Sequence, residues 1–282
     1  MKFVIPSLSR ATLLCEKTLA LLVKKFQIDQ SSIYVFVVAE EYKSYALTAH
    51  VLYPGIRLVV GPLGLHHMRN FIHAFFPENE ELVFLDDDIT DLVEMVEDTG
   101  VLDKNKSDRY PLRGLTTEQF MAYLTSAYSM MRKEGIYLWG IYPVKNGYFM
   151  KDLPAVTYDL RFIVGCFWGC INRPDRKITI EEKEDVERTL LYFKEDKKIL
   201  RFNRIAPVTT YYKQKGGMQA RGMDRIETSK QSCQYLIEKY PEYCRLYTGK
   251  KSGVWEVRLL SRSKPADCTS IVSISGNCVE SI

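Results

Sequence analysis

The sequence lacks any long hydrophobic run. The chain has 282 residues, 46% of them hydrophobic and 26% charged, and no run of about 18 or more apolar residues occurs. A membrane-spanning helix is therefore not expected. The first apolar stretch, residues 1–6, is too short and too soon interrupted by proline and polar residues to indicate a signal peptide. The length is sufficient for one substantial hydrophobic core.

Cysteine and histidine are both scarce. The seven cysteines are odd in number, and although Cys166 and Cys170 are spaced CxxxC, no second Cys or His pair follows at zinc-site spacing. We therefore expect reduced thiols in a cytoplasmic protein. Only four histidines occur, all before residue 74. His66 and His67 are adjacent, and neighbours on a helix face different directions, which disfavours a metal site built on that pair.

The net charge of +4 is small but unevenly distributed. Residues 194–251 contain 14 Lys and Arg against 6 Asp and Glu, a local excess of eight positive charges, so the rest of the chain is negative. A basic region of this kind fits a polyanionic partner or a phosphate-rich ligand. A solvated basic face explains the same excess equally well.

The first ninety residues alternate between β-type and helical patterns. Short β-branched and aromatic runs predict strands at 2–5, 33–39, 56–60 and 81–85, and apolar residues at helical spacing predict helices at 12–26, 40–51 and 65–76. This order predicts an α/β fold with a mostly parallel sheet.

The second half is less regular. We expect helices at 116–134, 180–196 and 228–240, the first capped by Thr116 or Thr117, and strands at 137–144, 161–172, 200–212 and 254–259. From residue 261 the chain is rich in serine, which predicts a flexible tail. No internal repeat and no long linker divide residues 1–260.

Three consecutive carboxylates, Asp86, Asp87 and Asp88, follow the apolar strand at 81–85. Adjacent anions repel one another, and a divalent cation relieves that repulsion. Mg²⁺ bound by one or two carboxylates commonly takes its other ligands from substrate phosphates. Side-chain alternation places Asp86 and Asp88 on one side, with Asp87 directed to a ribose or a basic side chain. The alternative is a charged loop after a strand.

Two other strands also end in polar segments. Residues 6–10 contain Pro6, Ser7 and Arg10, and free N–H groups at a helix start together with Arg10 can hold an anion. Residues 61–70 end in Arg69 and Asn70, which can pair with phosphate and bind the edge of a heterocycle. In open α/β sheets ligands bind at the carboxyl ends of strands. The alternative for residues 6–10 is a simple helix cap by Ser9.

Candidate acceptor-side residues occur later in the chain. Gly165 and Gly169 enclose Phe167 and Trp168, an arrangement that suits either a platform for sugars and bases or a strand with core aromatics. Acidic residues at 181–188 include Glu184 and Asp185. The helix dipole stabilises such residues, and one that faces a cleft can act as a general base.

A basic loop surrounds Gly216 and Gly217. Its cations, Lys213, Lys215 and Arg221, suggest a mobile loop that closes over phosphates. The P-loop pattern GxxxxGK[ST] is absent.

Together these segments resemble the GT-A-type nucleotide-sugar glycosyltransferases over roughly residues 2–260. The triplet 86–88 matches their DxD motif, residues 6–10 resemble the first nucleotide loop, and Arg69 and Asn70 resemble a nucleotide-contacting pair. Residues 165–169 are similar to an acceptor-side loop, and Glu184 with Asp185 is similar to the acidic motif that supplies the base in inverting members. The resemblance implies one domain, with a nucleotide-binding half at about 1–96, an antiparallel acceptor half at about 97–260 and a tail at 261–282.

A narrower resemblance is to the TET/JBP-associated glycosyltransferases of phages, eukaryotic viruses and trypanosomes. It is carried by Tyr211-Tyr212-Lys213, Gly216-Gly217-Met218-Gln219, Lys239-Tyr240-Pro241 and Gly253-Val254-Trp255-Glu256-Val257-Arg258. These enzymes are implicated in glycosylating hydroxymethylated pyrimidines such as hydroxymethylcytosine in DNA. If the protein is viral, this implies a place in the host-cell cytoplasm or nucleus.

The resemblance implies a UDP-sugar donor and Mn²⁺ or Mg²⁺ held by Asp86 and Asp88. It implies nucleotide-sugar binding by Pro6, Ser7, Arg10, Arg69, Asn70, Asp86, Asp87, Lys213, Lys215 and Arg221, acceptor binding by Gly165, Phe167 and Trp168, and catalysis by Asp185 with Glu184. One departure matters: many GT-A enzymes use a C-terminal histidine as a further metal ligand, and here no histidine follows the triplet.

Other functions also fit the sequence. The acceptor of such a transferase could be a protein or a glycan instead of DNA. A nucleotidyltransferase also joins paired aspartates to a nucleotide. A nucleic-acid-binding protein with a degenerate transferase fold would need no donor at all.

Overall fold

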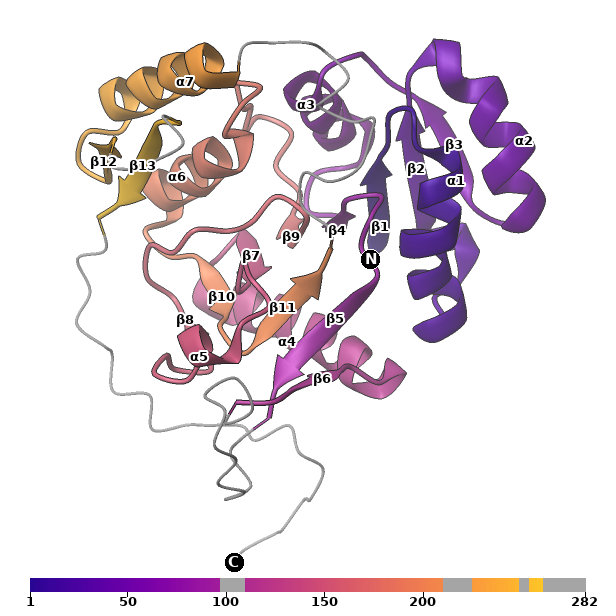
Figure 1. Ribbon diagram of the computed structural model, residues 1–282, viewed down its shortest axis with the longest axis horizontal. Helices are drawn as coiled ribbons and strands as arrows, with labels where there is room; N and C mark the ends of the chain where they lie inside the picture. Colours follow the sequence, from indigo (N-terminus) through magenta and orange to yellow (C-terminus); the bar gives the residue numbers. More distant parts are fainter. Residues whose placement is uncertain (97–109, 210–224, 249–253, 261–282) are drawn as a thin grey trace, which may run out of the picture.

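The computed structural model describes residues 1–96, 110–209, 225–248 and 254–260. Its centre is an eight-stranded sheet with the order β3-β2-β1-β4-β9-β7-β10-β8 (Figure 1). These strands are β1 (Lys2–Pro6), β2 (Ile33–Val37), β3 (Arg57–Val60), β4 (Glu81–Leu85), β7 (Leu138–Ile141), β8 (Val156–Thr157), β9 (Phe167–Ile171) and β10 (Leu200–Phe202). A second sheet contains β11 (Ile205–Val208), β5 (Asp91–Met95) and β6 (Leu112–Gly114), and β12 (Cys244–Tyr247) pairs with β13 (Glu256–Leu259).

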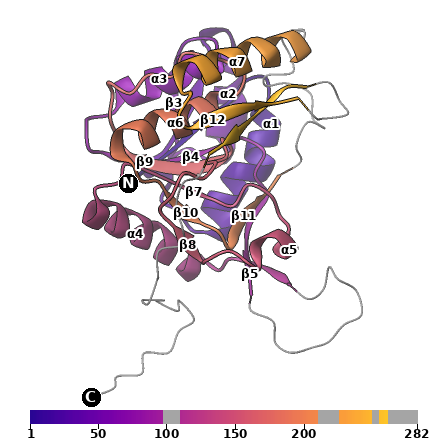
Figure 2. The ribbon, with the colours of Figure 1, turned by 90° about the vertical axis from the view of Figure 1, so that its left-hand side faces the viewer.

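Helices cover both faces of the large sheet. They are α1 (Ala11–Leu14), which continues as the π-helix η1 (Cys15–Lys25), α2 (Tyr42–Leu52), α3 (Leu65–Phe75), α4 (Thr117–Glu134), α5 (Gly147–Met150), α6 (Glu184–Asp196) and α7 (Arg225–Lys239), with short 3-10 turns η2 (Gln30–Ser32) and η3 (Ala39–Glu41). Figure 1 shows α3, α6 and α7 together at the top of the view and α1 and α2 at its right. In Figure 2, α4 lies below the sheet, opposite α3 and α7.

Strand pairing confirms the predicted fold class. β1, β2, β3 and β4 are mutually parallel where they pair, and β7 is parallel to β10. The antiparallel strand β9 joins the two parallel groups, because it pairs with both β4 and β7. The fold is therefore α/β with a mostly parallel sheet and some antiparallel strands.

The alternation of side chains along each strand fills two hydrophobic cores. In β4, Val83 and Leu85 belong to the core beneath η1, α2 and α4, whereas Leu82 and Phe84 belong to the core beneath α3, α6 and α7. Successive residues of a strand point to opposite faces, so a strand buried on both faces is apolar throughout. This explains why β1, β2 and β4 were predictable from short apolar runs, whereas β3 is an edge strand without a buried residue.

The connections place a topological switch point between β1 and β4. From β1 the chain steps outward to β2 and then β3, and α3 then returns it to the other side of β1, where β4 pairs. Connections on the two sides of this point diverge, which leaves a crevice at the carboxyl ends of the two strands. Residues 7–10 follow β1 and residues 86–88 follow β4, so both polar segments lie at this crevice.

Some predicted boundaries were wrong. The expected strand at 161–172 begins only at Phe167. The expected strand at 200–212 is broken after Phe202, so that β10 and β11 belong to different sheets. The predicted cap at Thr116 is confirmed, because its side chain and that of Gln119 form a capping box. Within the described ranges, no helix is both long and apolar enough to cross a membrane.

Candidate functional site

The backbone of the aspartate turn is fixed independently of its carboxylates. Thr18, fully buried on η1, donates from Oγ1 to the carbonyl of Asp86 (2.7 Å) and accepts from the amide of Ile89 (3.0 Å). The amide of Asp86 donates to the carbonyl of Cys166 on the neighbouring segment (2.9 Å). One threonine thus bridges both ends of the turn, and the three side chains project from a defined backbone.

Asp87 is an internal tie between the two strand ends. It is 4% exposed, accepts from Ser7 Oγ at 2.6 Å through Oδ2 and from Arg10 Nη1 at 3.0 Å through Oδ1, and Ser7 in turn contacts the Tyr45 hydroxyl at 2.7 Å. Burial raises the pKa of Asp87, and the bonds from Ser7 and Arg10 oppose that rise. Each carboxylate oxygen has a partner, so Asp87 holds the loop after β1 against the turn. Its direct contact with nucleotide stays a prediction. The expectation of a basic partner is met by Arg10.

Asp86 and Asp88 present the more open carboxylates. The Asp86 side chain is 41% exposed and lies 3.7 Å from Arg69 Nη2. Asp88 accepts from Thr209 Oγ1 at 2.7 Å and lies 3.9 Å from Arg10 Nη1. Partial removal from water, together with the charges of Asp88, Asp87 and Glu184, raises the pKa of Asp86 to about 7, against the opposing effect of Arg69. A carboxylate in this state gains from a nearby cation.

The donor set decides what metal these residues can hold. Among the described residues, no group of three or more His, Cys, Asp or Glu side chains is placed to hold a metal ion. A complete protein cage of the kind used for structural zinc or calcium is therefore excluded for this part of the chain. Two carboxylates on one turn, Asp86 and Asp88, are hard oxygen donors that fit Mg²⁺ or Mn²⁺ with its remaining ligands taken from water and a substrate phosphate.

Arg69 and Glu184 lie together on the opposite wall of the site. Arg69, 2% exposed on α3, places Nε 3.0 Å from Glu184 Oε1 and donates from Nη2 to the carbonyl of Gly165 (3.0 Å). Glu184, 4% exposed at the start of α6, also lies 3.0 Å from Arg188 Nη1 through Oε2. Both oxygens of Glu184 are thus occupied by guanidinium groups, which leaves it poorly suited to accept a proton.

Asp185 is the better candidate for a base. It lies in the first turn of α6, its Oδ1 accepts from the amide of Val186 (2.9 Å), and a Cβ on Gly165 would lie 3.5 Å from its Oδ2. Burial and the neighbouring Glu184 raise the pKa of Asp185 to about 6, against the effects of Arg188, the Val186 amide and Arg69. A Cβ on Gly165 would come closest to Glu184 Oε1, at 3.1 Å, so the absence of a side chain there mainly spares Glu184. The structure therefore brings Asp185, Gly165 and Arg69 to the same place.

Three side chains that the sequence analysis assigned to ligand binding contact other parts of the protein instead. The Asn70 amide donates to the carbonyl of Ile178 (2.8 Å) and accepts from its amide (3.1 Å), so it clamps the segment before α6. Phe167 and Trp168 are 2% and 0% exposed and belong to the two hydrophobic cores. The expected aromatic platform for an acceptor was therefore wrong, because these rings serve packing. The predicted role of Gly165 in acceptor binding stays a prediction.

Some predictions lie outside the described residues. These are the loop cations Lys213, Lys215 and Arg221, the central part of the basic region, and the tail at 261–282.

Sequence reasoning missed two glutamates that join helices around the site, one at the start of α3 and one between α6 and α7. Glu181 accepts from the amide of Leu65 (2.8 Å) and contacts His66 Nδ1 (2.5 Å), and so occupies the start of α3. Glu187, fully buried, accepts from Lys239 (2.8 Å) and from the amide of Thr179 (2.6 Å), which fastens α6 to α7. Their only local signal was an acidic run, which the helix dipole explains without any partner.

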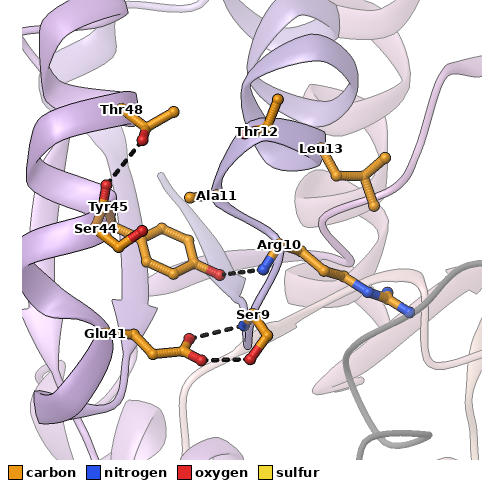
Figure 3. Close-up of a pocket in the computed structure, with 9 residues that line it drawn as sticks. All are labelled: Ser9, Arg10, Ala11, Thr12, Leu13, Glu41, Ser44, Tyr45 and Thr48. Atoms are coloured by element: carbon orange, nitrogen blue, oxygen red, sulfur yellow. Dashed lines mark hydrogen bonds between the residues drawn. The ribbon is translucent and has the colours of Figure 1, made fainter.

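A cavity of about 540 Å³ lies beside the loop after β1 (Figure 3). It is lined by Ser9, Arg10, Ala11, Thr12, Leu13, Glu41, Ser44, Tyr45 and Thr48. Glu41 accepts from the Ser9 amide (2.7 Å), and the Tyr45 hydroxyl accepts from the Arg10 amide (3.1 Å). In Figure 3 the Arg10 side chain points away from the other lining residues, and its guanidinium reaches Asp87. The same loop therefore borders both the cavity and the aspartate turn.

Comparisons with known proteins do not assign the chain to a family. No protein-family model matches the chain, and no curated protein matches it. The chain is similar to a protein assigned to the nucleotide-diphospho-sugar transferases from Desulfovibrio desulfuricans, with 13% identity, a TM-score of 0.39, and coverage of 85% of this chain and 99% of that one.

Two further solved structures are similar over shorter stretches. Mannose-6-phosphate isomerase from Helicobacter pylori has 10% identity, a TM-score of 0.37, and coverage of 71% of this chain and 85% of that one. Mannose-1-phosphate geranyltransferase from Thermus thermophilus has 13% identity, a TM-score of 0.30, and coverage of 72% of this chain and 56% of that one. At these identities and scores the likenesses carry no argument about this chain, and the function has to be argued from the site.

Proposed function

We propose that this protein is a metal-dependent glycosyltransferase that uses a nucleotide-sugar donor. The observation that carries the proposal is the meeting of two polar strand ends at the switch point, where Asp87 fastens the loop after β1 to a turn from which Asp86 and Asp88 remain available. A crevice of this kind is where open α/β sheets bind nucleotides. An anionic pair beside it suits a metal-bound diphosphate.

The donor is held by residues from both walls of the crevice. Asp86 and Asp88 would hold Mg²⁺ or Mn²⁺, which when bound neutralises the charge that develops on the departing nucleoside diphosphate. Arg69 lies 3.7 Å from Asp86 and is proposed to contact the diphosphate as well. Lys213, Lys215 and Arg221 are proposed, from the sequence, to close over it.

The nucleoside occupies the cavity beside the loop after β1. Glu41 and Ser44 supply polar groups there. Tyr45 is buried behind the cavity, and its hydroxyl holds the loop through Ser7 and the Arg10 amide. Pro6 and Ser7 hold the loop in place from the end of β1, because Ser7 bonds to both Tyr45 and Asp87. A bulky substitution such as Ser44→Trp fills this cavity and is expected to weaken UDP binding without affecting metal binding.

Asp185 is the proposed base for transfer with inversion. Its carboxylate takes the proton of the acceptor hydroxyl while the acceptor oxygen forms a bond to the anomeric carbon and the bond from that carbon to the diphosphate breaks. A pKa near 6 leaves the carboxylate ionised at neutral pH yet basic enough to accept the proton. Transfer with retention needs no such base, so the stereochemistry of the product tests this role.

The proposed acceptor is the hydroxymethyl group of a modified pyrimidine in DNA. The proposal is supported by the resemblance to DNA-modifying transferases and by the excess of eight positive charges in residues 194–251. A base inside a duplex has to be flipped out of the stack to reach such a site, and phosphate contacts would make binding strongly dependent on salt.

The proposal is tested by incubating the protein with a panel of UDP-sugars and Mn²⁺, together with hydroxymethylated or unmodified DNA, and analysing the nucleosides by mass spectrometry. A glycosylated nucleoside from the hydroxymethylated DNA alone is the expected result. Donor hydrolysis without DNA glycosylation would redirect the search to protein or glycan acceptors. Absence of both donor hydrolysis and metal-dependent UDP binding would leave the nucleic-acid-binding alternative.

A matched pair of variants ties the activity to the site. Asp88→Asn is expected to abolish it, whereas Asp175→Asn, an aspartate on an exposed turn with a 66% exposed side chain, should leave it unchanged. Full activity in Asp88→Asn would exclude the metal assignment.

A further inference from the structure

Arg188 is a buried cation that touches none of the residues proposed to contact substrate. It lies on α6, is 2% exposed, and its guanidinium lies over the ring of Trp168 at 3.8 Å. Trp168 in turn stacks on Phe84 of β4, with ring centres 3.9 Å apart and an angle of 5° between the planes. A guanidinium packed against an aromatic face is rigidly oriented, which a lysine ammonium in the same place would not be.

The hydrogen-bonding partners of Arg188 lead toward the site. Nη2 donates to the carbonyl of Ile163 (3.2 Å), and Nη1 lies 3.0 Å from Glu184 Oε2. The other oxygen of Glu184 lies 3.0 Å from Nε of Arg69. A single carboxylate therefore has one guanidinium on each oxygen.

The position of Arg69 depends on this arrangement. Besides Glu184, Arg69 contacts the carbonyl of Gly165 (3.0 Å) and lies 3.7 Å from Asp86. If Glu184 moved away, Arg69 would be free to close on Asp86, since an arginine and a carboxylate form a bidentate pair readily. That pair would occupy both the carboxylate proposed to bind metal and the cation proposed to contact the diphosphate.

We propose that Arg188 is a positioning residue of the donor site. By holding Glu184, it keeps Arg69 at 3.7 Å from Asp86, so that Asp86 stays available to the metal and Arg69 to the diphosphate. The proposal deepens the proposed function and rests on it for the donor, whereas the geometric part, the fixing of Arg69 through Glu184, does not.

The first test needs no ligand. In an NMR spectrum of arginine side chains, the Nε–Hε group of Arg69, assigned with Arg69→Lys, is expected to exchange slowly with water because it faces Glu184 in the interior. Arg188→Met should speed this exchange at least tenfold. The control is Arg173→Met, which removes an arginine that is likewise paired with an α6 carboxylate, Asp196 (2.7 Å), and packed on an aromatic ring, Tyr137 (3.2 Å), and it should leave the Arg69 signal unchanged. Unchanged exchange in Arg188→Met would overturn the proposal.

The second test separates position from charge. Arg188→Met and Glu184→Gln change the net charge of the group in opposite directions, and the double variant restores it. We expect the dissociation constant for UDP with Mn²⁺, measured by calorimetry, to rise about tenfold or more in Arg188→Met and to stay raised in the double variant. Recovery in the double variant would show that charge alone matters and would overturn the positioning role.

Melting temperatures of all variants show whether a loss of binding reflects unfolding. Arg188→Lys keeps the positive charge but loses the planar guanidinium stacked on Trp168. We therefore expect its affinity for UDP with Mn²⁺ to lie between those of the wild type and Arg188→Met. If the wild-type protein itself fails to bind UDP with Mn²⁺, the proposed function fails. The exchange measurement then still decides whether Arg188 fixes Arg69.

Discussion

Two buried carboxylates stand on opposite walls of the site, and they are held in different ways. Asp87 is held by one arginine and one hydroxyl, both from the loop after β1, so that Asp87 and these two partners together carry no net charge. Glu184 is held by two arginines from different helices, so that Glu184 and these two partners together carry one positive charge. The first arrangement joins neighbouring strand ends, and the second joins α3 to α6.

The difference indicates a division of tasks. A neutral tie fixes the shape of a loop without altering the charge of the crevice. An interior guanidinium in excess favours anions nearby, and here the nearby anions are Asp86, Asp185 and, by proposal, the donor diphosphate. In the proposed function, one wall defines where the donor lies, and the other places positive charge beside the donor diphosphate.

The largest expected effect falls on the wall formed by Arg69, Glu184, Asp185 and Arg188, called the charged wall from here on. Asp185→Asn removes the proposed base, and general-base catalysis commonly contributes about 10²- to 10⁴-fold, so we expect a loss of that order in the rate of transfer with UDP binding retained. Because the base has to be ionised and the pKa of Asp185 is about 6, wild-type kcat/KM should fall as the pH drops below about 6 and level off above it. A pH profile of transfer measures this. Wild-type activity in Asp185→Asn would contradict the assignment.

The next expected effect is a difference in unfolding free energy between variants of Glu184 and Asp87. Glu184→Gln leaves two buried guanidinium groups without their anion, and breaking a buried ion pair from one side commonly costs about 3–5 kcal/mol. Asp87→Asn keeps an oxygen acceptor for one neighbour and should cost about 1–3 kcal/mol. Urea unfolding of both variants compares the walls directly. Equal losses would mean that the excess charge at Glu184 does not matter.

Acid should remove a stabilising contribution from His73. His73 on α3 is buried, its Nδ1 donates to Asn172 Oδ1 (2.7 Å), and burial, with the charges of Arg188 and Arg69, lowers its pKa to about 4. The unfolded chain takes up a proton at this residue near pH 6.5 and the folded chain only near pH 4, so the contribution of His73 is complete above about 6.5 and falls by roughly 3 kcal/mol as the pH drops through that window. The raised pKa values of Asp86 and Asp185 act in the opposite sense.

This loss is checked by measuring unfolding free energies from pH 7 to pH 4. His73→Gln keeps a side-chain N–H group but has no proton to gain, so the stability of the wild type should fall relative to that of the variant over the window. A variant that follows the wild-type curve throughout would show that other groups dominate the acid response.

The smallest effect concerns the wall formed by Ser7, Arg10, Thr18 and Asp87, called the neutral wall from here on. Thr18→Val removes the hydroxyl that bridges Asp86 and Ile89 while keeping nearly the same shape, so two buried backbone groups lose their partner. We expect a loss of about 1–3 kcal/mol in stability and weaker UDP binding from a looser turn. Thermal unfolding and calorimetry measure both. Unchanged UDP affinity would show that the turn keeps its shape without the bridge.

The neutral wall could be predicted from the sequence to a large extent. Ser7, Arg10 and Asp87 follow strands that the apolar runs identified, and carboxyl ends of neighbouring parallel strands meet at one edge of a sheet. Thr18 was not predictable, because a threonine inside a helical pattern carries no sign of a partner about seventy residues away.

The charged wall was only partly predictable. Arg69, Glu184 and Asp185 were singled out as types of residue, but their pairing depends on how α3 packs against α6, which local periodicity does not determine. Phe167 and Trp168 were misassigned for a related reason. Glycines beside aromatic residues occur both at ligand platforms and in buried strands, and only the cover provided by helices on both faces decides between them.

The most direct test of the account is the binding of UDP measured by calorimetry with Mn²⁺ and, separately, with a chelator. The account predicts binding that requires Mn²⁺ and is lost in Asp88→Asn while the variant stays folded. UDP binding of equal strength with and without the metal, or in Asp88→Asn, would contradict the claim that the aspartate turn holds a metal-bound diphosphate.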